Sequence, residues 1–352
     1  MGNTLEKNME MNKQSKIHVG IIGAGSIVKQ RHLPGLQRIP GVEIIAVCNN
    51  RVESAEKVAN AYGIPEIAAH WEDLIKRPDL DVIWIGTTPH LHARVTIAAL
   101  EAGKHVFCQA RMAMNLAEAR QMVKAAREHS RQITMLCPPP NGLKNGVYFG
   151  KLLRENYIGT ILHFHLNSLN MSWADPAAPA HWRQQIELSG NNILSAGIYA
   201  EVLDRFFGQP LSLCAQGRVC VPDRQGYHVE IPDFVQVLGL WPQEIYGSLE
   251  WSGLAQYAPQ DSLTAYGTEG TLVYDFATDN ILVGRRGDIH LKSIQVPKEY
   301  VRDWTVEEDF IRAIRNGGQP EPNFDTGLRY MQFVEAIHVS LREHRWVELS
   351  SL

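Results

Sequence analysis

The sequence predicts a chain of two domains: an N-terminal α/β domain built on a parallel sheet, and a C-terminal α+β domain with a large, open, mostly antiparallel sheet. Three observations carry this prediction. Up to residue 137, short apolar runs alternate with amphipathic segments, as in a parallel sheet with helices on both faces. Three prolines at residues 138–140 then stop the pattern. Beyond them, polar and apolar residues mostly alternate with period two, which is typical of antiparallel strands with one open face.

In the N-terminal domain, each expected strand is a short apolar run and each expected helix carries an apolar stripe. Gly63 and Gly103 follow two of the helices, and Asn115 precedes the last one. Glycine is common just past a helix end, and asparagine is common just before a helix start. The expected strands are residues 17–23, 42–48, 81–86, 105–109 and 132–137, and the expected helices are residues 30–39, 51–63, 91–103 and 115–130.

The C-terminal domain is expected to open with one helix and to close with two, at residues 143–157, 305–318 and 326–344. Strands separated by turn signals lie between them. They are expected at residues 160–171, 213–222, 233–241, 244–253, 262–276 and 280–286. The predicted division of the chain is therefore a disordered tail at 1–15, a first domain at 16–138 and a second domain at 139–352.

The composition argues against several classes of protein. The formal net charge of −4 supports neither a nucleic-acid surface nor a basic membrane patch. No apolar run approaches the roughly 20 residues that span a bilayer, and the polar start lacks the apolar core of a secretory signal. The five cysteines form no C-x-x-C pair, which favours reduced thiols in a cytoplasmic protein. We expect no membrane, nucleic-acid or metal partner.

A glycine-rich turn follows the first strand in "VGIIGAGSIVKQRH". Gly23 permits a tight turn, and Gly25 lets the backbone approach a pyrophosphate. Ser26 and Ile27 then begin a helix, whose N-terminal amides bind anions. The third motif position, usually Gly or Ala, is Val28. The strand–turn–helix context predicts a Rossmann domain that binds NAD or NADP.

The second strand ends as "AVCNNR". A carboxylate at this point binds the ribose 2′-hydroxyl of NAD, whereas an arginine accepts the 2′-phosphate of NADP. Asn49 can hydrogen-bond a hydroxyl and does not repel a phosphate. Arg51 is either a phosphate ligand or a solvated residue at the start of a helix. The pattern leaves both cofactors open, with a slight preference for NADP or dual use.

Four segments resemble one family of enzymes: "GIIGAGSI", "AVCN", "GTTPHLHARVTIAALEAGKHVFCQARMAMN" and "GLRYMQFVEAIHVSLREHRWVEL". Over residues 16–350 the chain resembles the glucose-fructose oxidoreductase/inositol dehydrogenase/rhizopine-catabolism (Gfo/Idh/MocA) family. The resemblance implies NAD(P)-linked oxidation or reduction of a sugar or cyclitol, and a homodimer or homotetramer formed through the open sheet. It also implies that Thr87, Thr88, Pro89 and His92 line the cofactor site.

The resemblance breaks at the family's Glu-Lys-Pro motif, whose lysine assists proton transfer. Those positions hold Gln109, Ala110 and Arg111 here. The methyl group of Ala110 can neither donate nor accept a proton. Gln109 could still hold the nicotinamide or ribose by hydrogen bonds, and Arg111 could place a positive charge at the cofactor.

The family's second motif, Asp-x-Gly-x-His, is also replaced, by Ser195, Gly197 and Tyr199. Asn191, Ser195 and Tyr199 are spaced by four and are expected on one helix face with Asn192 alongside. We interpret this face as the border of a polar substrate pocket. Tyr199 is the first candidate acid or base, provided that nearby positive charge from Arg111 and an oxidised nicotinamide lowers its pKa from about 10.

The segment "PAHWRQQ" resembles the family's substrate loop. Trp182 offers a sugar ring an apolar face, and Arg183 offers its hydroxyls a forked donor. His181 titrates near neutral pH and is the second candidate acid or base.

The sequence therefore predicts an NAD(P)-dependent oxidoreductase of the sugar, glycoside or cyclitol type with a non-standard acid–base set. Two alternatives stay open. One is a glycoside-cleaving enzyme that oxidises its substrate transiently, eliminates the leaving group and returns the hydride. The other is a catalytically inactive nucleotide-binding regulatory protein.

Overall fold

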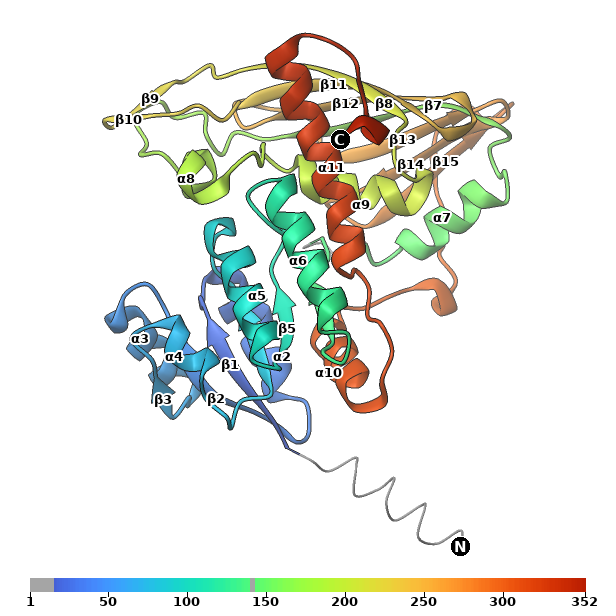
Figure 1. Ribbon diagram of the computed structural model, residues 1–352. Helices are drawn as coiled ribbons and strands as arrows, with labels where there is room; N and C mark the ends of the chain where they lie inside the picture. The colour runs from blue at the N-terminus through green and yellow to red at the C-terminus, as the bar shows by residue number, and fades with distance from the viewer. Residues whose placement is uncertain (1–15, 140–142) are drawn as a thin grey trace, which may run out of the picture. The chain divides into compact units, whose positions relative to one another are not determined.

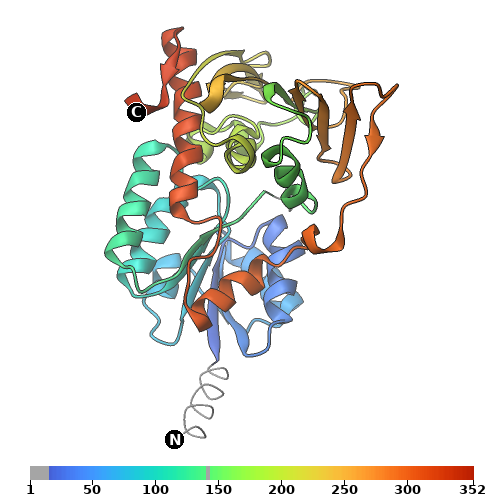
Figure 2. The ribbon, with the colours of Figure 1, turned by 90° about the vertical axis from the view of Figure 1, so that its right-hand side faces the viewer.

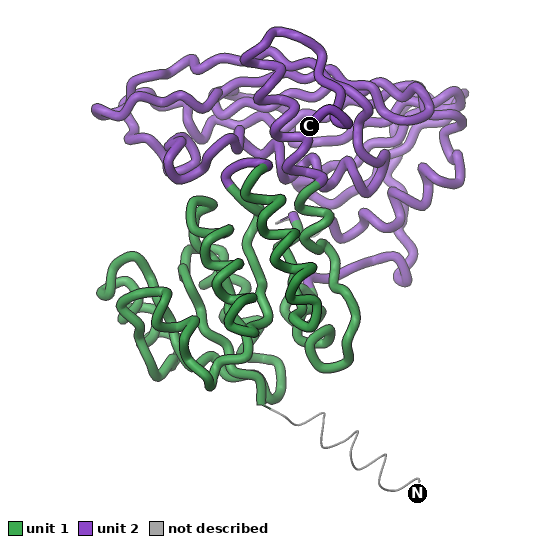
Figure 3. The backbone as a smooth tube through the Cα atoms, viewed as in Figure 1, with its two compact units in different colours: residues 1–113, 117–138, 305–328 green, residues 114–116, 139–304, 329–352 purple. Residues whose placement is uncertain are grey.

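The computed structural model describes residues 16–139 and 143–352, so the predicted tail at 1–15 lies outside the described residues. The chain forms two compact units (Figure 3). Unit 1 contains the described residues up to Ala113, then residues 117–138 and 305–328; unit 2 contains residues 114–116, 139–304 and 329–352. No helix among the described residues is long and apolar enough to cross a membrane.

Unit 1 is built on a sheet of six parallel strands in the order β3-β2-β1-β4-β5-β6. Strands β1 and β4 lie side by side in its centre, so the loops that follow them meet at one edge of the sheet, as the doubly wound fold requires. The strands are β1 (Ile17–Ile22), β2 (Val42–Cys48), β3 (Glu66–Ile67), β4 (Val82–Ile85), β5 (His105–Cys108) and β6 (Thr134–Leu136).

Helices flank this sheet, as Figures 1 and 2 show. They are η1 (Val28–His32), α2 (Leu33–Gln37), α3 (Val52–Tyr62), α4 (Trp71–Ile75), η2 (Pro89–Leu91), α5 (His92–Glu101), α6 (Leu116–Glu128) and α10 (Val306–Asn316). The last of these corrects the predicted division at 138, because α10 belongs to unit 1 and not to the second domain. Its Phe310 ring packs edge-on against Trp84 and Phe107, with centroids 5.8 and 5.7 Å away. Burial of this aromatic cluster explains why the chain returns to the first unit.

Unit 2 contains a nine-stranded sheet in the order β16-β15-β14-β13-β7-β12-β11-β8-β17. Neighbouring strands are antiparallel except for the parallel pair β7 and β12. The strands are β7 (Ile161–Leu169), β8 (Ser212–Arg218), β11 (Phe234–Trp241), β12 (Ile245–Ser252), β13 (Ser262–Gly267), β14 (Gly270–Asp275), β15 (Asn280–Arg285), β16 (Lys292–Ser293) and β17 (Val347–Glu348). A separate two-stranded ribbon pairs β9 (Asp223–Arg224) with β10 (Tyr227–His228).

One face of this sheet is covered by helices and the other is open. The helices are α7 (Gly146–Arg154), α9 (Ala196–Phe207) and the part of α11 (Phe324–Glu343) that lies in unit 2. Phe207 of α9 stacks on Phe164 of β7, with centroids 4.2 Å apart. Along β11, Val235 and Val237 are buried, whereas Gln236 between them and Leu238 after them are exposed, Leu238 at 55%. This alternation is the pattern that predicted an open antiparallel sheet.

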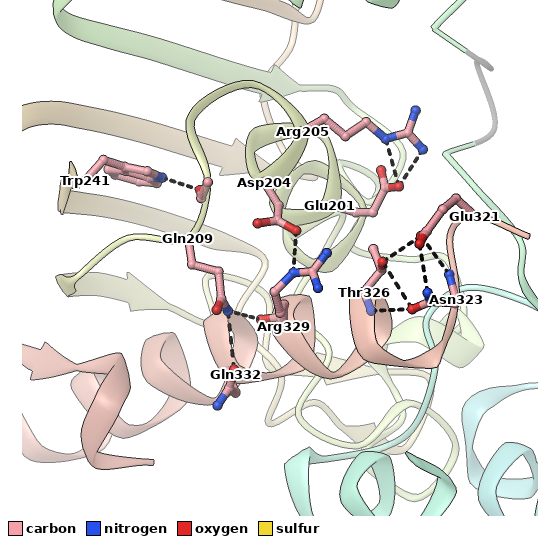
Figure 4. A network of polar contacts seen from close by, with 11 residues as sticks. Glu201, Asp204, Arg205, Gln209, Trp241, Glu321, Asn323, Thr326, Arg329 and Gln332 are labelled. Carbon is pink, nitrogen blue, oxygen red and sulfur yellow. Dashed lines mark hydrogen bonds and ion pairs between the residues drawn. The ribbon is translucent and has the colours of Figure 1, made fainter. Parts of the chain in front are cut away.

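Helix α9 is held on its sheet by polar contacts at its C-terminal end, which Figure 4 shows. Arg329 of α11 donates from Nε to Asp204 Oδ2 at 2.7 Å. Beyond the helix end, Gln209 Nε2 donates to the Arg329 carbonyl at 2.9 Å, and Trp241 Nε1 donates to the Gly208 carbonyl at 3.0 Å. These bonds fix the direction of the helix whose other end carries Ser195.

Candidate active site

The glycine loop joins β1 to the helix that follows it. Gly23 has φ +87°, and a side chain there would lie 2.6 Å from the Thr87 backbone nitrogen. Only glycine fits both conditions. Gly25 and Ser26 are exposed at the start of the helix, and a side chain on Gly25 would find only one atom within 4 Å, the Gly86 carbonyl oxygen at 3.8 Å. The space over Gly25 is therefore left open by the protein, as a pyrophosphate requires.

Val28 occupies the third motif position without disturbing this loop. Its side chain is fully buried. A side chain on Gly86 would lie 2.4 Å from Val28 Cγ2, so a glycine directly after β4 makes room for the valine. The close helix–strand packing that a third glycine normally allows is thus reached through Gly86.

Asn49 and Arg51 lie at the end of β2, where a ribose contact was predicted. Asn49 Oδ1 accepts the Ala24 N–H of the glycine loop at 2.7 Å, and its Nδ2 donates to Ser54 Oγ at 3.0 Å. Arg51 is exposed and immediately precedes α3. Asn49 therefore shapes the loop itself, and the predicted contacts of both side chains with the ribose stay predictions.

The segment after β4 carries Thr87, Thr88 and Pro89. Both threonines are half-buried, and Pro89 is buried as the first residue of η2. Thr88 Oγ1 lies 2.7 Å from His90 Nδ1. The buried Thr87 Oγ1 has no hydrogen-bond partner among the described residues. A buried hydroxyl without a partner at this strand end fits a ligand that brings one.

His92 was expected to line the cofactor site, and this expectation is wrong for its side chain. The imidazole has no exposed surface. Nε2 lies 2.9 Å from the Thr87 carbonyl oxygen, and Nδ1 lies 2.9 Å from the Arg111 carbonyl oxygen. His92 therefore ties the segment after β4 to the segment after β5, and it acts on the site by holding those two backbones.

Acidification is expected to destabilise unit 1 through His92. Burial lowers the pKa of this imidazole from its ordinary 6.5, although hydrogen bonds to the Thr87 and Arg111 carbonyls oppose the shift. Below pH 6.5 the imidazole of the unfolded chain becomes protonated, whereas the imidazole in the folded unit takes up a proton only at lower pH. The contribution of His92 to the free energy of unfolding is therefore fully present above pH about 7. It falls as the pH drops through 6.5 toward the lowered pKa. The thermal midpoint should fall less between pH 7.5 and 5.5 in His92→Gln than in the wild type, and equal falls would contradict this role.

Gln109 faces the interior of unit 1. Its side-chain nitrogen contacts His32 Nε2, and His32 Nδ1 contacts Glu307 Oε1 of α10. All three side chains are buried, at 7%, 0% and 1% exposure. This buried chain of polar groups, Gln109–His32–Glu307, gives the Gln109 amide nitrogen a structural partner, so its predicted contact with the nicotinamide stays a prediction. Arg111, whose guanidinium was expected near the cofactor, is 3% exposed.

In unit 2, Tyr199 belongs to a cluster of hydroxyl groups around one carboxylate. Asp261, directly before β13, accepts the Tyr199 hydroxyl at 2.7 Å and the Ser168 hydroxyl at 2.7 Å, both on Oδ2. Its Oδ1 accepts the Leu169 N–H at 3.1 Å. Ser168 Oγ also lies 3.1 Å from Ser195 Oγ. We call Asp261, Ser168, Ser195 and Tyr199 the carboxylate cluster.

The carboxylate cluster overturns the predicted state of Tyr199. Burial raises the pKa of its phenol, and the charge of Asp261 raises it further. The expectation that positive charge lowers this pKa is wrong, because the group that meets the hydroxyl is a carboxylate. Tyr199 is 7% exposed and packs against Phe276 with ring centroids 5.0 Å apart. A phenol in this setting is a poor base at neutral pH.

Asn191 does not share a helix face with Ser195 and Tyr199, because α9 begins only at Ala196. The preceding turn contains Leu194 with φ +44°, which no helix tolerates. Asn191 Nδ2 donates to Glu335 Oε2 of α11 at 3.1 Å. Asn192 is buried and donates to the Ser189 carbonyl at 2.6 Å. Both asparagines stabilise their own turn, and their contact with a substrate stays a prediction.

His181, Trp182 and Arg183 form a local unit at the short helix η3 (Trp182–Gln184). The exposed His181 precedes this helix, and its Nδ1 accepts the Arg183 N–H at 3.2 Å. The Arg183 guanidinium lies 4.2 Å from the centroid of the Trp182 ring, within cation–π distance. A guanidinium at this distance from an aromatic ring keeps its forked N–H donors, which suit hydroxyl recognition. The proton-transfer role of His181 stays a prediction.

The described residues contain no group of three or more His, Cys, Asp or Glu side chains that could hold a metal ion. His163 stacks on Tyr266 with centroids 4.6 Å apart, and His165 Nδ1 lies 2.8 Å from Ser248 Oγ.

Sequence reasoning missed His32, Glu307, Ser168 and Asp261. His32 stands in "KQRH", directly after the glycine loop, and a polar side chain inside an otherwise apolar stripe was the available signal. Glu307 lies 275 residues from its partner His32, and Asp261 lies 62 residues from Tyr199. No local pattern marks such pairs.

Comparison with known proteins agrees with this arrangement. A model described as "Oxidoreductase family, NAD-binding Rossmann fold" matches residues 17–136, and the model of the GFO/IDH/MocA C-terminal domain matches residues 148–273. The chain belongs to the Gfo/Idh/MocA oxidoreductase family. It is an NAD(P)-dependent oxidoreductase, with the nucleotide-binding loop of that family in unit 1.

Several relatives of this family match nearly the whole chain. Levoglucosan dehydrogenase of Pseudarthrobacter phenanthrenivorans is 26% identical over 96% of this chain and 99% of its own length. Myo-inositol 2-dehydrogenase of Thermotoga maritima is 24% identical over 96% of this chain and 99% of its own length. Among solved structures, levoglucosan dehydrogenase in complex with NADH and L-sorbose superposes with a TM-score of 0.85 at 24% identity, over 95% of this chain and 99% of that one.

Proposed function

We propose that this family member oxidises a hydroxyl group of a sugar, glycoside or cyclitol with NAD(P)⁺. The observation that carries the proposal is the intact glycine loop of unit 1, in a chain that matches levoglucosan and inositol dehydrogenases along nearly its whole length. The Trp182–Arg183 pair of unit 2, at cation–π distance, supports the substrate class, because an aromatic face and a forked donor suit a polyhydroxylated ring.

The residues of unit 1 fit the cofactor in three places. The exposed backbone of Gly25 and Ser26, with Ile27, would hold the pyrophosphate at the helix start. Asn49 and Arg51 would face the adenine-side ribose, and a 2′-phosphate would find a cation in Arg51. The Thr87 hydroxyl, with Thr88 and Pro89, would meet the nicotinamide side. When bound, NAD(P)⁺ supplies the hydride acceptor.

The remaining chemistry is done by side chains of this chain. Trp182 and Arg183 orient the sugar ring, and a basic group accepts the hydroxyl proton that leaves as the carbon is oxidised. The resemblance implies a lysine where this chain has Ala110, whose methyl group cannot accept a proton, so we propose another acceptor. The raised pKa of Tyr199 argues against its phenol as the acceptor at neutral pH. His181 is one candidate, and the carboxylate cluster is the other.

A panel assay tests the function. Purified protein is incubated with NAD⁺ or NADP⁺ and with levoglucosan or myo-inositol, and absorbance at 340 nm is followed. We expect net NAD(P)H formation with at least one compound. Glycoside cleavage at constant absorbance would favour the transient-oxidation alternative. Nucleotide binding without product from any compound would favour the inactive regulatory alternative, and either result would contradict net oxidation.

We further propose that the chain forms a homodimer or homotetramer through the open face of the sheet in unit 2. The register aligns Tyr246 of β12 with His163 of β7, and His163 with Tyr266 of β13. Tyr246 is 59% and Leu238 is 55% exposed, so apolar and aromatic surface is left open on this face. Light scattering should give two or four times the mass of the chain, and the mass of a single chain would refute this assembly.

A further inference from the structure

Three elements of unit 2 bring the carboxylate cluster together. Ser168 lies near the end of β7, Asp261 directly precedes β13, and Ser195 and Tyr199 belong to the start of α9. Ser168 is 3% exposed and Tyr199 is 7% exposed, whereas Ser195 and Asp261 are half-buried. The cluster therefore has two buried members and two members, Ser195 and Asp261, that keep part of their surface exposed.

The hydrogen bonds between the two serines and the carboxylate have a defined direction. A serine hydroxyl has one proton, and Ser168 gives its proton to Asp261 Oδ2 at 2.7 Å. The contact of 3.1 Å between Ser168 Oγ and Ser195 Oγ must then use the proton of Ser195. The lone pairs of Ser195 Oγ are left to accept a hydrogen from outside the cluster. The chain of donors thus runs inward, from Ser195 through Ser168 to Asp261.

Ser195 behaves unlike a structural helix cap. It occupies the residue before α9, where a serine side chain normally accepts a backbone N–H of the first turn. Its hydroxyl makes no such bond. The side chain is instead directed to Ser168.

We propose that Asp261 is the terminal proton acceptor of the reaction, and that Ser195 and Ser168 relay the proton from the substrate hydroxyl. The substrate O–H bond breaks as its proton passes to Ser195 Oγ; the Ser195 proton passes to Ser168, and the Ser168 proton passes to Asp261 Oδ2. The substrate carbon becomes a carbonyl carbon, and its hydrogen leaves with two electrons to NAD(P)⁺. The products are the ketone, NAD(P)H and a protonated Asp261. This inference rests on the proposed function.

In this scheme Ser195 contacts the substrate, whereas Tyr199 is a positioning residue. Its hydroxyl donates to the same Oδ2 that receives the relayed proton. The bond fixes the carboxylate in the direction of Ser168, and the buried ring of Phe276 fixes the phenol in turn. Tyr199→Phe should therefore slow turnover much less than loss of the carboxylate does.

The test compares Asp261→Asn with a matched control, Asp279→Asn. Asp279 also accepts a buried phenol, that of Tyr274, and a backbone N–H, that of Lys144, in the turn between β14 and β15 of the same sheet. With the panel compound that the wild type oxidises, Asp261→Asn should lower kcat by roughly 10²–10⁴-fold, the span of general acid–base groups. Asp279→Asn should alter the thermal midpoint to a similar extent and leave kcat within about twofold of the wild type, because it lies outside the relay.

Further readouts separate the relay from a structural role. Ser195→Ala should lower kcat with little change in KM, and Ser195→Thr, which keeps a hydroxyl, should restore most of the rate. Independently of activity, the phenol signal at 295 nm that Tyr199→Phe removes should titrate at lower pH in Asp261→Asn, since the charge of Asp261 opposes ionisation of that phenol.

The outcomes are distinct. An active wild type with equal kcat in Asp261→Asn and Asp279→Asn would overturn the relay and leave the proposed function in place. Ser195→Ala with wild-type kcat would overturn it equally, even if Asp261→Asn failed to fold. An inactive wild type would overturn the proposed function, and the relay with it.

Discussion

Removing the Glu307 carboxylate is expected to destabilise the protein by about 3 kcal/mol, because it leaves one end of a buried polar chain without its partner. Glu307 is 1% exposed and contacts His32, which is fully buried and contacts Gln109 in turn. In Glu307→Ala, His32 Nδ1 would lose the acceptor that fixes its ring. The side chain of Glu307 also fills the space over Gly35, where an added side chain would meet it at 2.7 Å, so truncation opens a cavity as well.

Urea denaturation of Glu307→Ala against Glu128→Ala measures this effect. Glu128 forms an exposed pair with Lys124 on α6 of the same unit, and such surface pairs contribute about 0–1 kcal/mol. A double variant, His32→Leu with Glu307→Met, should lose less stability than the sum of the single variants, because an apolar pair needs no compensation. A loss in Glu307→Ala no larger than that in Glu128→Ala would contradict a structural role for the buried chain.

Much of the fold could be predicted from local patterns. The apolar runs that predicted the strands of the first domain correspond to β1, β2, β4, β5 and β6, and period-two alternation predicted the open sheet, with β11 as its clearest case. These features depend on residues that are neighbours in the sequence. The return of α10 to unit 1 could not be predicted in this way, because it depends on the packing of Phe310 against Trp84 and Phe107, some 200 residues earlier in the chain.

The candidate site was predicted less completely, for the same physical reason. The glycine motif predicted the tight turn at Gly23 and the close backbone approach at Gly25, because both depend on a single turn of the chain. The environment of Tyr199 could not be predicted, because the pKa of its phenol is raised by burial in the folded unit and by the charge of Asp261, which lies 62 residues away, directly before β13. Likewise, two positive φ values, at Gly190 and Leu194, delay the start of α9 and remove Asn191 from the face where its spacing had placed it.

Two substitutions in one glycine loop are expected to have opposite effects on folding and on cofactor binding. Gly23→Ala should destabilise the fold itself, by about 2–4 kcal/mol. Its φ of +87° is strained for a residue with a side chain, and the added carbon would meet the Thr87 nitrogen at 2.6 Å. Gly25→Val should leave the fold nearly unchanged, because only the Gly86 carbonyl oxygen lies within 4 Å, at 3.8 Å, of a carbon added there.

Cofactor binding, unlike stability, should be impaired by the change at Gly25. A valine on Gly25 occupies the open space over the start of the helix, which the pyrophosphate needs. Calorimetric titration of Gly25→Val with NADH should therefore show a dissociation constant raised at least tenfold, or about 1.4 kcal/mol, at a nearly unchanged thermal midpoint. Gly23→Ala should show a clearly lowered thermal midpoint in the absence of cofactor. Wild-type affinity in a folded Gly25→Val would place the pyrophosphate elsewhere, because the contact that the mutation blocks is the one by which this loop recognises a dinucleotide.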